Sequence, residues 1–148
     1  MKNIVFICTG NTCRSPMAEA MLRRALEVRG VGGIAVSSAG VYAHPGARPS
    51  GDSIDQMDRR GIDIRGHRSR SVMTVPLDGA LVLGMTASHV AAVKTLAPDV
   101  DARTMMDYAG LAGQIDDPFG RGAPAYARCA DQIAEAIELI ADKLKGEM

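Results

Sequence analysis

The fold of this chain is decided by residues 3–16, which read NIVFICTGNTCRSP. Residues 3–7 form a short apolar run with β-branched side chains, which is typical of a strand buried in a parallel sheet. Ser15 and Pro16 then have the character of the N-cap and the first residue of a helix. The stretch therefore predicts a strand, a tight loop and a helix in direct succession.

The loop between this strand and this helix has the chemistry of an oxyanion site. Backbone N–H groups at a helix N-terminus lack partners within the helix and carry partial positive charge, so a loop wrapped around them binds anions. Gly10 allows a tight turn, and Asn11 suits a left-handed conformation or hydrogen bonds across the loop. The expected phosphate-binding residues are Thr9, Gly10, Asn11, Thr12, Cys13 and Ser15.

Two reactive side chains bracket this loop, Cys8 and Arg14. Thiolates are favoured at helix N-termini and beside cations, so the loop amides and Arg14 together favour a thiolate on Cys8. The planar guanidinium of Arg14 can hold two phosphoryl oxygens at once, and Ser15 can donate a hydrogen bond to the sulfur. The alternative is that Cys8 is a small buried apolar residue. Because the strand, loop and helix signals agree, we favour a phosphate-transfer site.

Strand-like and helix-like segments alternate along the rest of the chain. The predicted strands are 3–7, 34–38, 80–84 and 102–105. The predicted helices are 15–29, 50–60, a short irregular one within 69–77, 86–97, and a long one from Pro124 onward. This alternation predicts an α/β fold with a central four-stranded parallel sheet, right-handed crossovers and helices on both faces. Ligands of such sheets bind at the carboxyl ends of the strands, where Cys8 lies.

The composition fits one domain spanning residues 1–148. Hydrophobic residues make up 47% of the chain without any low-complexity stretch, so one core can form. Lys plus Arg and Asp plus Glu number 17 each, so we expect no nucleic-acid or membrane partner. We also expect a monomer. Residues 1–2 lead directly into the first strand, so we expect no signal peptide. Three unevenly spaced cysteines give no disulfide framework, which favours the reducing cytoplasm.

The histidines and the last cysteine do not form a pattern of metal ligands. His44, His67 and His89 lie in different segments, so we expect surface or capping roles and no metal. Cys129 falls on the apolar stripe of the long final helix, which predicts core packing. The other members of this stripe are Tyr126, Ile133, Ile137, Ile140 and Leu144.

The motif Cys8-x5-Arg14-Ser15-Pro16, together with Asp117-Pro118 about a hundred residues later, resembles the low-molecular-weight protein tyrosine phosphatase family. The resemblance covers the whole chain and implies the phosphotyrosine protein phosphatase I-like fold, phosphorylated protein substrates and no cofactor. It also implies a two-step hydrolysis in which Cys8 attacks phosphorus to give a phosphocysteine. Arg14 and the loop amides would stabilise the transition state. Asp117 would protonate the leaving group and then activate water.

Asp117 has both an alternative interpretation and a rival. Asp-Pro is an ordinary turn dipeptide, and Asp116 stands beside it as a second carboxylate. The residue before a proline is held extended, so Asp117 is projected from a loop rather than wound into a helix. In the presence of the Cys8 loop, this favours Asp117 as the acid.

The resemblance also gives Cys13 a redox interpretation. In the family a cysteine at this position can form a reversible disulfide with the nucleophile, and Cys13 lies five residues after Cys8. The alternative is a small residue that fills the loop. Both interpretations stay open at the level of sequence.

Two residues bear on the substrate, Thr12 and Phe119. Tyrosine-specific relatives usually carry an aliphatic β-branched residue at position 12, whereas the loop with Thr12 resembles the bacterial protein arginine phosphatases. A hydroxyl can accept a hydrogen bond from a guanidinium N–H, although Thr12 could also only fill volume. Phe119 also resembles the arginine branch and could stack on a guanidinium. We therefore favour phosphoarginine, with phosphotyrosine as the alternative.

Two further functions are less favoured. A thiol-dependent arsenate reductase begins with an oxyanion in the same kind of loop, but it needs further cysteines to relay a disulfide. Residues 78–98 contain none, and Cys129 is expected to be buried. A non-catalytic phosphate-binding module would have no use for Asp117 or for a thiolate. The protein substrates and the opposing kinase are not encoded in any motif.

Overall fold

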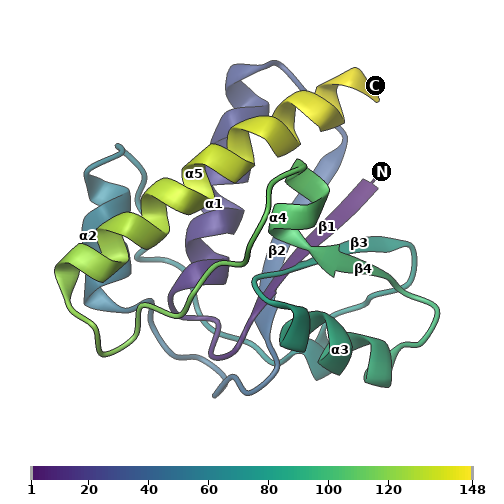
Figure 1. Cartoon of the computed structure of the whole chain (residues 1–148), viewed down its shortest axis with the longest axis horizontal. Coiled ribbons are helices and arrows are strands. Elements are labelled where there is room, and N and C mark those ends of the chain that lie inside the picture. Colours follow the sequence, from purple (N-terminus) through teal and green to yellow (C-terminus); the bar gives the residue numbers. More distant parts are fainter. Residues whose placement is uncertain (1, 148) are drawn as a thin grey trace.

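Four parallel strands form the centre of the structure, a computed structural model that describes residues 2–147 (Figure 1). The strands are β1 (Lys2–Cys8), β2 (Ile34–Gly40), β3 (Ala80–Gly84) and β4 (Asp101–Thr104). Their order across the sheet is β2-β1-β3-β4, with every pairing parallel. The predicted four-stranded parallel sheet is confirmed. Because the strand order changes direction at β1, a crevice opens beside the carboxyl end of that strand, where Cys8 lies.

Helices cover both faces of this sheet. They are α1 (Arg14–Val28), α2 (Gly51–Asp58), the 3-10 turn η1 (Val72–Thr74), α3 (Ala87–Leu96), α4 (Met105–Ala109) and α5 (Ala123–Gly146). The long helix α5 lies over α1 and also contacts α2 and α4, whereas α3 packs against β1, β3 and β4 (Figure 1). The fold is a single α/β domain, as predicted.

Strand β1 is buried from both sides. Its side chains alternate, so that Ile4, Phe6 and Cys8 join the core beneath α1 and α5, while Val5 and Ile7 join the core on the α3 side. A strand with helices on both faces has no polar side, which explains its uninterrupted apolar run. As a consequence, the sulfur of Cys8 lies on the face that is covered by the start of α1.

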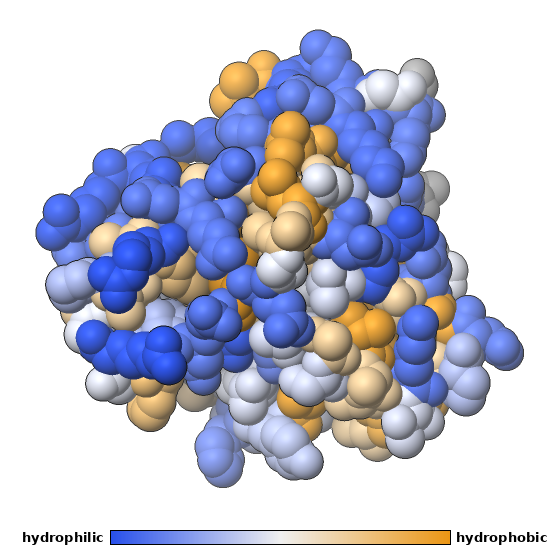
Figure 2. Space-filling view, viewed as in Figure 1, coloured by the Kyte–Doolittle hydropathy of each residue, from blue (hydrophilic) through white to orange (hydrophobic). Residues whose placement is uncertain are grey.

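Helix α5 confirms the predicted apolar stripe. Its six predicted stripe residues, Cys129 included, are all buried. Burial raises the pKa of the Cys129 thiol to about 12, so this cysteine is an inert part of the core. The face seen in Figure 2 is mainly hydrophilic, with hydrophobic side chains only in separated patches. Within residues 2–147 no helix is both long and apolar enough to cross a membrane.

Element boundaries differ from the prediction around β4. The predicted strand 102–105 begins one residue earlier, and Met105 already belongs to α4. This short helix was not predicted because five residues are too few to show a helical period. It begins where the hydroxyl of Thr104 accepts the N–H of Asp107 at 3.1 Å, and it ends at Gly110, which has a φ of 80°.

Candidate active site

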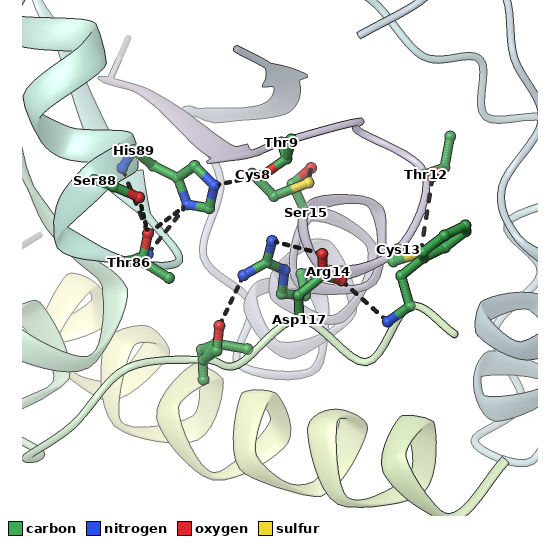
Figure 3. Close-up of polar contacts among 12 residues, drawn as sticks. Cys8, Thr9, Thr12, Cys13, Arg14, Ser15, Thr86, Ser88, His89 and Asp117 are labelled. Carbon is green, nitrogen blue, oxygen red and sulfur yellow. Dashed lines mark hydrogen bonds and ion pairs between the residues drawn. The ribbon is translucent and has the colours of Figure 1, made fainter. Parts of the chain in front are cut away.

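The loop that follows β1 wraps around the start of α1 (Figure 3). The helix begins at Arg14, and its N-cap is Cys13, which makes no side-chain cap. The predicted N-cap role of Ser15 is therefore wrong, because Ser15 already lies inside the first turn. Without a capping side chain, the N–H groups of this turn stay available to an anion.

Asn11 holds the loop from its centre. It is fully buried and has a φ of 57°, so both the left-handed conformation and the cross-loop hydrogen bonds predicted for it are confirmed. Its Nδ2 donates to Ser15 Oγ at 2.8 Å and to Ser38 Oγ at 2.9 Å, while its Oδ1 accepts the N–H of Arg70 at 3.0 Å. These three bonds fix the orientation of the amide.

The direction of these hydrogen bonds determines what reaches Cys8. Because Asn11 supplies the hydrogens to both serines, each serine hydroxyl keeps its own proton for another acceptor. Ser38 donates to Glu19 Oε1 at 2.6 Å. Ser15 Oγ lies 2.8 Å from Cys8 Sγ, so its proton is directed at the sulfur. A hydroxyl that donates to this sulfur stabilises the thiolate form.

The backbone that directly follows β2 supports the first half of the loop. The N–H groups of Val41 and Tyr42 donate to the carbonyl oxygens of Cys8 and Thr9 at 3.0 and 2.9 Å. This close approach requires Gly40, since a Cβ added there would lie 2.4 Å from the carbonyl oxygen of Thr9. The lack of a side chain at Gly40 therefore lets the end of β2 pack directly against the loop.

Two further segments support the second half of the loop. Ser50 N–H donates to the carbonyl oxygen of Thr12 at 2.9 Å. His67 is half-buried, and its Nε2 lies 2.8 Å from the carbonyl oxygen of Asn11, which can only accept. The expected surface or capping role is wrong for His67, because this side chain donates to the loop. His44 is exposed, as expected.

Arg14 and Asp117 meet at the edge of the loop (Figure 3). Arg14 is only 3% exposed, and its Nη1 donates to the carbonyl oxygen of Ile115 at 2.8 Å. Its Nη2 lies 3.8 Å from Asp117 Oδ2. The side chain of Asp117 is 53% exposed, and its Oδ1 accepts the N–H of Phe119 at 3.1 Å. The fold thus brings two residues about a hundred positions apart into one site.

A cavity of about 220 Å³ lies between these groups. It is lined by Cys8, Thr9, Gly10, Thr12, Cys13, Arg14, Asp117 and Phe119. The rival carboxylate Asp116 instead lines a neighbouring cavity of about 230 Å³, which Asp117 shares. Of the two carboxylates, Asp117 is therefore the one that lines the cavity beside Cys8. Among residues 2–147 no cluster of His, Cys, Asp or Glu side chains is arranged to hold a metal ion.

Cys13 is anchored by hydroxyl groups behind the loop. Its sulfur lies 3.2 Å from the hydroxyl of Tyr126 on α5 and 3.5 Å from that of Ser50 before α2. Burial, followed by the contact with Cys13, raises the pKa of Tyr126, so the phenol is protonated at neutral pH. All three cysteines are free thiols.

His89 reaches the loop from α3, and sequence reasoning missed this contact. Its Nε2 lies 2.9 Å from Thr9 Oγ1, and its Nδ1 accepts the N–H of Thr86 at 3.2 Å. The second bond completes a capping box, so the expected capping role is confirmed. Burial and then the Arg14 cation lower the pKa of His89, Asp117 opposes both, and the resulting pKa is about 4. The spacing Thr86-x-x-His89 after an apolar strand was a signal for the cap, but not for the contact with Thr9.

Residues 3–148 match the model of a family described as low molecular weight phosphotyrosine protein phosphatase. The chain belongs to this family. The protein-arginine-phosphatase of Geobacillus stearothermophilus is 36% identical to it, over 97% of each chain. The low molecular weight protein-tyrosine-phosphatase Etp of Escherichia coli K12 is 30% identical, over 96% of this chain and 94% of that one. The predicted family is confirmed, and the phosphatase described here has relatives of both substrate classes.

A solved structure of the family supports the covalent mechanism. It is a cysteine-to-serine mutant of YwlE arginine phosphatase with a phosphorylated active-site serine. This solved structure matches the chain described here with a TM-score of 0.91 at 32% identity, over 97% of this chain and 95% of the solved one. A phosphorylated side chain at the active site fits a mechanism that proceeds through a phosphoenzyme.

Proposed function

We propose that this protein phosphatase hydrolyses phosphorylated side chains through a phosphocysteine on Cys8, with phosphoarginine as the favoured substrate. The observation that carries the proposal is the Ser15 hydroxyl aimed at Cys8 Sγ, at the N-terminus of a helix that no side chain caps. This arrangement favours a thiolate beside amides that bind an oxyanion. The site offers a nucleophile and a place for the phosphoryl group in one loop.

In the first step, the Cys8 thiolate forms a bond to phosphorus while the bond from phosphorus to the leaving nitrogen or oxygen breaks. Arg14 and the loop amides stabilise the charge of the transferring phosphoryl group. Asp117 gives its proton to the leaving group. In the second step, Asp117 accepts a proton from water, the water oxygen bonds to phosphorus, and the sulfur leaves as a thiolate.

The preference for phosphoarginine rests on Thr12 and Phe119. Thr12 is half-buried and lines the cavity, and its hydroxyl has only a weak contact, 3.7 Å from Cys13 Sγ. It can therefore accept a guanidinium N–H, which an aliphatic side chain would leave unpaired. Phe119 is 74% exposed at the same cavity, where a planar guanidinium can stack on it. Phosphotyrosine stays the alternative, supported by the likeness to Etp.

The decisive experiment compares phosphate release from a phosphoarginine peptide and a phosphotyrosine peptide of the same sequence. We expect wild type to prefer phosphoarginine, and Thr12→Ile to lower the ratio of the two kcat/KM values by roughly ten- to a hundredfold, because one buried hydrogen bond is lost. Thr12→Ser keeps the hydroxyl and serves as the control. A wild type that prefers phosphotyrosine, or a ratio that Thr12→Ile leaves unchanged, would replace the arginine assignment with the tyrosine one.

We also propose a redox role for the pair Cys8 and Cys13. Both are free thiols that line the same cavity, and a disulfide between them would protect the nucleophile from irreversible oxidation. Peroxide should then inactivate the enzyme reversibly, with the disulfide found by peptide mass mapping. A sulfinic acid on Cys8 with Cys13 still free would contradict this.

A last proposal concerns the cellular compartment, the oligomeric state and the partners of the enzyme. We propose that the enzyme acts in the reducing cytoplasm as a monomer on phosphorylated proteins, without a nucleic-acid or membrane partner. The free cysteines support the reducing compartment, and the equal numbers of acidic and basic residues argue against a nucleic-acid or membrane partner. Size-exclusion chromatography with light scattering tests the monomer.

A further inference from the structure

The hydroxyl of Thr9 is held by a histidine from the opposite face of the sheet (Figure 3). His89 belongs to α3 and is 4% exposed, and its Nε2 lies 2.9 Å from Thr9 Oγ1. Thr9 directly follows Cys8 and lines the cavity of the candidate active site. A buried ring that contacts the loop beside the nucleophile can influence the chemistry there.

The contacts of the ring fix its tautomer. Thr86 presents both its N–H, at 3.2 Å, and its hydroxyl oxygen, at 3.1 Å, to His89 Nδ1. Because the N–H can only donate whereas the hydroxyl can also donate, both contacts are satisfied when Nδ1 carries a lone pair and no proton. In a neutral imidazole the proton then lies on Nε2. Burial and the Arg14 cation both keep the ring neutral, while Asp117 is the charged group that acts in the other direction. His89 Nε2–H therefore donates to Thr9 Oγ1.

The direction of the hydrogen bond from His89 determines where Thr9 can donate its own proton. A threonine hydroxyl has one proton and two lone pairs, and His89 occupies one lone pair. The hydroxyl proton of Thr9 is therefore available for donation to a different acceptor. In a cavity that also presents the Arg14 guanidinium, the acceptor that arrives with substrate is the anionic phosphoryl group.

We infer that Thr9 donates its hydroxyl hydrogen to a phosphoryl oxygen of the bound substrate, and that His89 is the positioning residue that directs this hydrogen. The inference rests on the proposed phosphatase activity and adds a side-chain donor to the loop amides and Arg14. Because Nδ1 of His89 is bound to the N-cap of α3, the direction of the donor is set by the sheet's far face before substrate arrives. Such a donor needs no reorganisation when charge develops in the transition state.

The experiment is a double-mutant cycle of Thr9→Val and His89→Phe, with p-nitrophenyl phosphate as substrate and kcat and KM determined separately. We expect Thr9→Val to lower kcat roughly tenfold, which corresponds to one hydrogen bond that strengthens in the transition state. His89→Phe should lower kcat about three- to tenfold in the wild-type background. In the Thr9→Val background it should have less than about a twofold effect, because the hydroxyl that it directs is absent.

Two variants control for structural damage. Thr9→Ser keeps the hydroxyl and should retain kcat within about threefold. His89→Gln offers an amide oxygen to the cap and an N–H to Thr9, so it should restore most of the kcat lost in His89→Phe. If His89→Phe does not fold, the cycle is run with His89→Leu, and thermal unfolding is followed by circular dichroism for each variant.

The outcomes separate the inference from the proposed function. A kcat that Thr9→Val leaves unchanged, or losses for Thr9 and His89 that multiply independently, would overturn the inference in an enzyme that is otherwise an active phosphatase. A wild type that releases phosphate from none of the tested phosphomonoesters or phosphoarginine peptides would overturn the proposed function and this inference with it.

Discussion

The two sides of the active-site cavity are built in opposite ways. On one side, five of the eight residues from Cys8 to Ser15 are buried, and side chains or backbone from several segments hydrogen-bond to this loop. On the other side, Asp117 is 53% exposed, and Phe119 is 74% exposed. Within residues 2–147, Asp117 accepts one hydrogen bond, from Phe119 N–H, and forms one ion pair, with Arg14 at 3.8 Å.

This difference separates two tasks. A phosphoryl group has the same shape in every substrate, so its binding loop gains from a fixed geometry. The acid must reach leaving groups that differ from substrate to substrate, and an exposed segment with few contacts can move with low cost in free energy. Substitutions on the acid side should therefore change activity without changing stability, whereas substitutions in the binding loop should change both.

The largest effect is expected on the exposed side. Asp117→Asn should lower kcat by about 10²- to 10³-fold for phosphoarginine, whose leaving group needs a proton, and much less for p-nitrophenyl phosphate. The free energy of unfolding should change by less than about 0.5 kcal/mol, as is usual for an exposed residue. Steady-state kinetics and urea unfolding measure the two quantities.

Asp116→Asn is the matched control for this prediction, because it removes the adjacent carboxylate that lines the neighbouring cavity. It should leave kcat nearly unchanged for both substrates. If the effects of the two substitutions are interchanged, Asp116 is the acid and the assignment of Asp117 is wrong.

The next effect is expected in the buried loop. Asn11→Ala leaves the hydroxyls of Ser15 and Ser38 and the N–H of Arg70 without their partner. We expect a loss of about 2–4 kcal/mol in the free energy of unfolding, measured in urea, together with a loss of activity. Such a loss would show that the loop's order is coupled to the stability of the whole domain.

Asn11→Gly separates the side chain from the backbone at this position. It removes the same hydrogen bonds, but glycine adopts a φ of 57° without strain. Its loss should therefore be about 1 kcal/mol smaller than that of Asn11→Ala. A loss below about 1 kcal/mol in both variants would mean that the loop does not depend on Asn11.

The smallest effect concerns the pH dependence of stability. The pKa of His89 is lowered to about 4 in the folded protein, against about 6.5 for an unperturbed histidine. Between these values the unfolded chain binds more protons, so stability falls as pH decreases from about 6.5 towards 4. This one residue should account for about 2 kcal/mol of the difference between pH 7.5 and pH 5.

His89→Gln does not titrate in this range and provides the control. Urea unfolding at pH 7.5 and pH 5 should show a smaller difference for this variant than for wild type. An equal pH dependence in the two proteins would mean that His89 titrates normally, and it would also weaken the assigned tautomer.

Local sequence patterns correctly predicted the parallel sheet, the buried face of α5 and the conformation of Asn11. The apolar run before Cys8, the apolar stripe of α5 and the alternation of segments gave the parallel sheet, because each depends on periodicities of a few residues. Asn11 was correctly placed in a left-handed conformation for the same local reason. The N-cap role of Ser15 was wrong because a serine before a proline has the same pattern whether its hydroxyl caps the helix or binds a sulfur.

By itself, the sequence determined the order of the elements, the loop that follows Cys8 and the family. Only the tertiary structure decided that Ser38, His67 and His89 support that loop, and that Asp117 rather than Asp116 faces its cavity. Contacts between residues so far apart in the sequence produce no local periodicity or motif by which they could be predicted. They exist because parallel strands end at one edge of the sheet and bring the loops that follow them together.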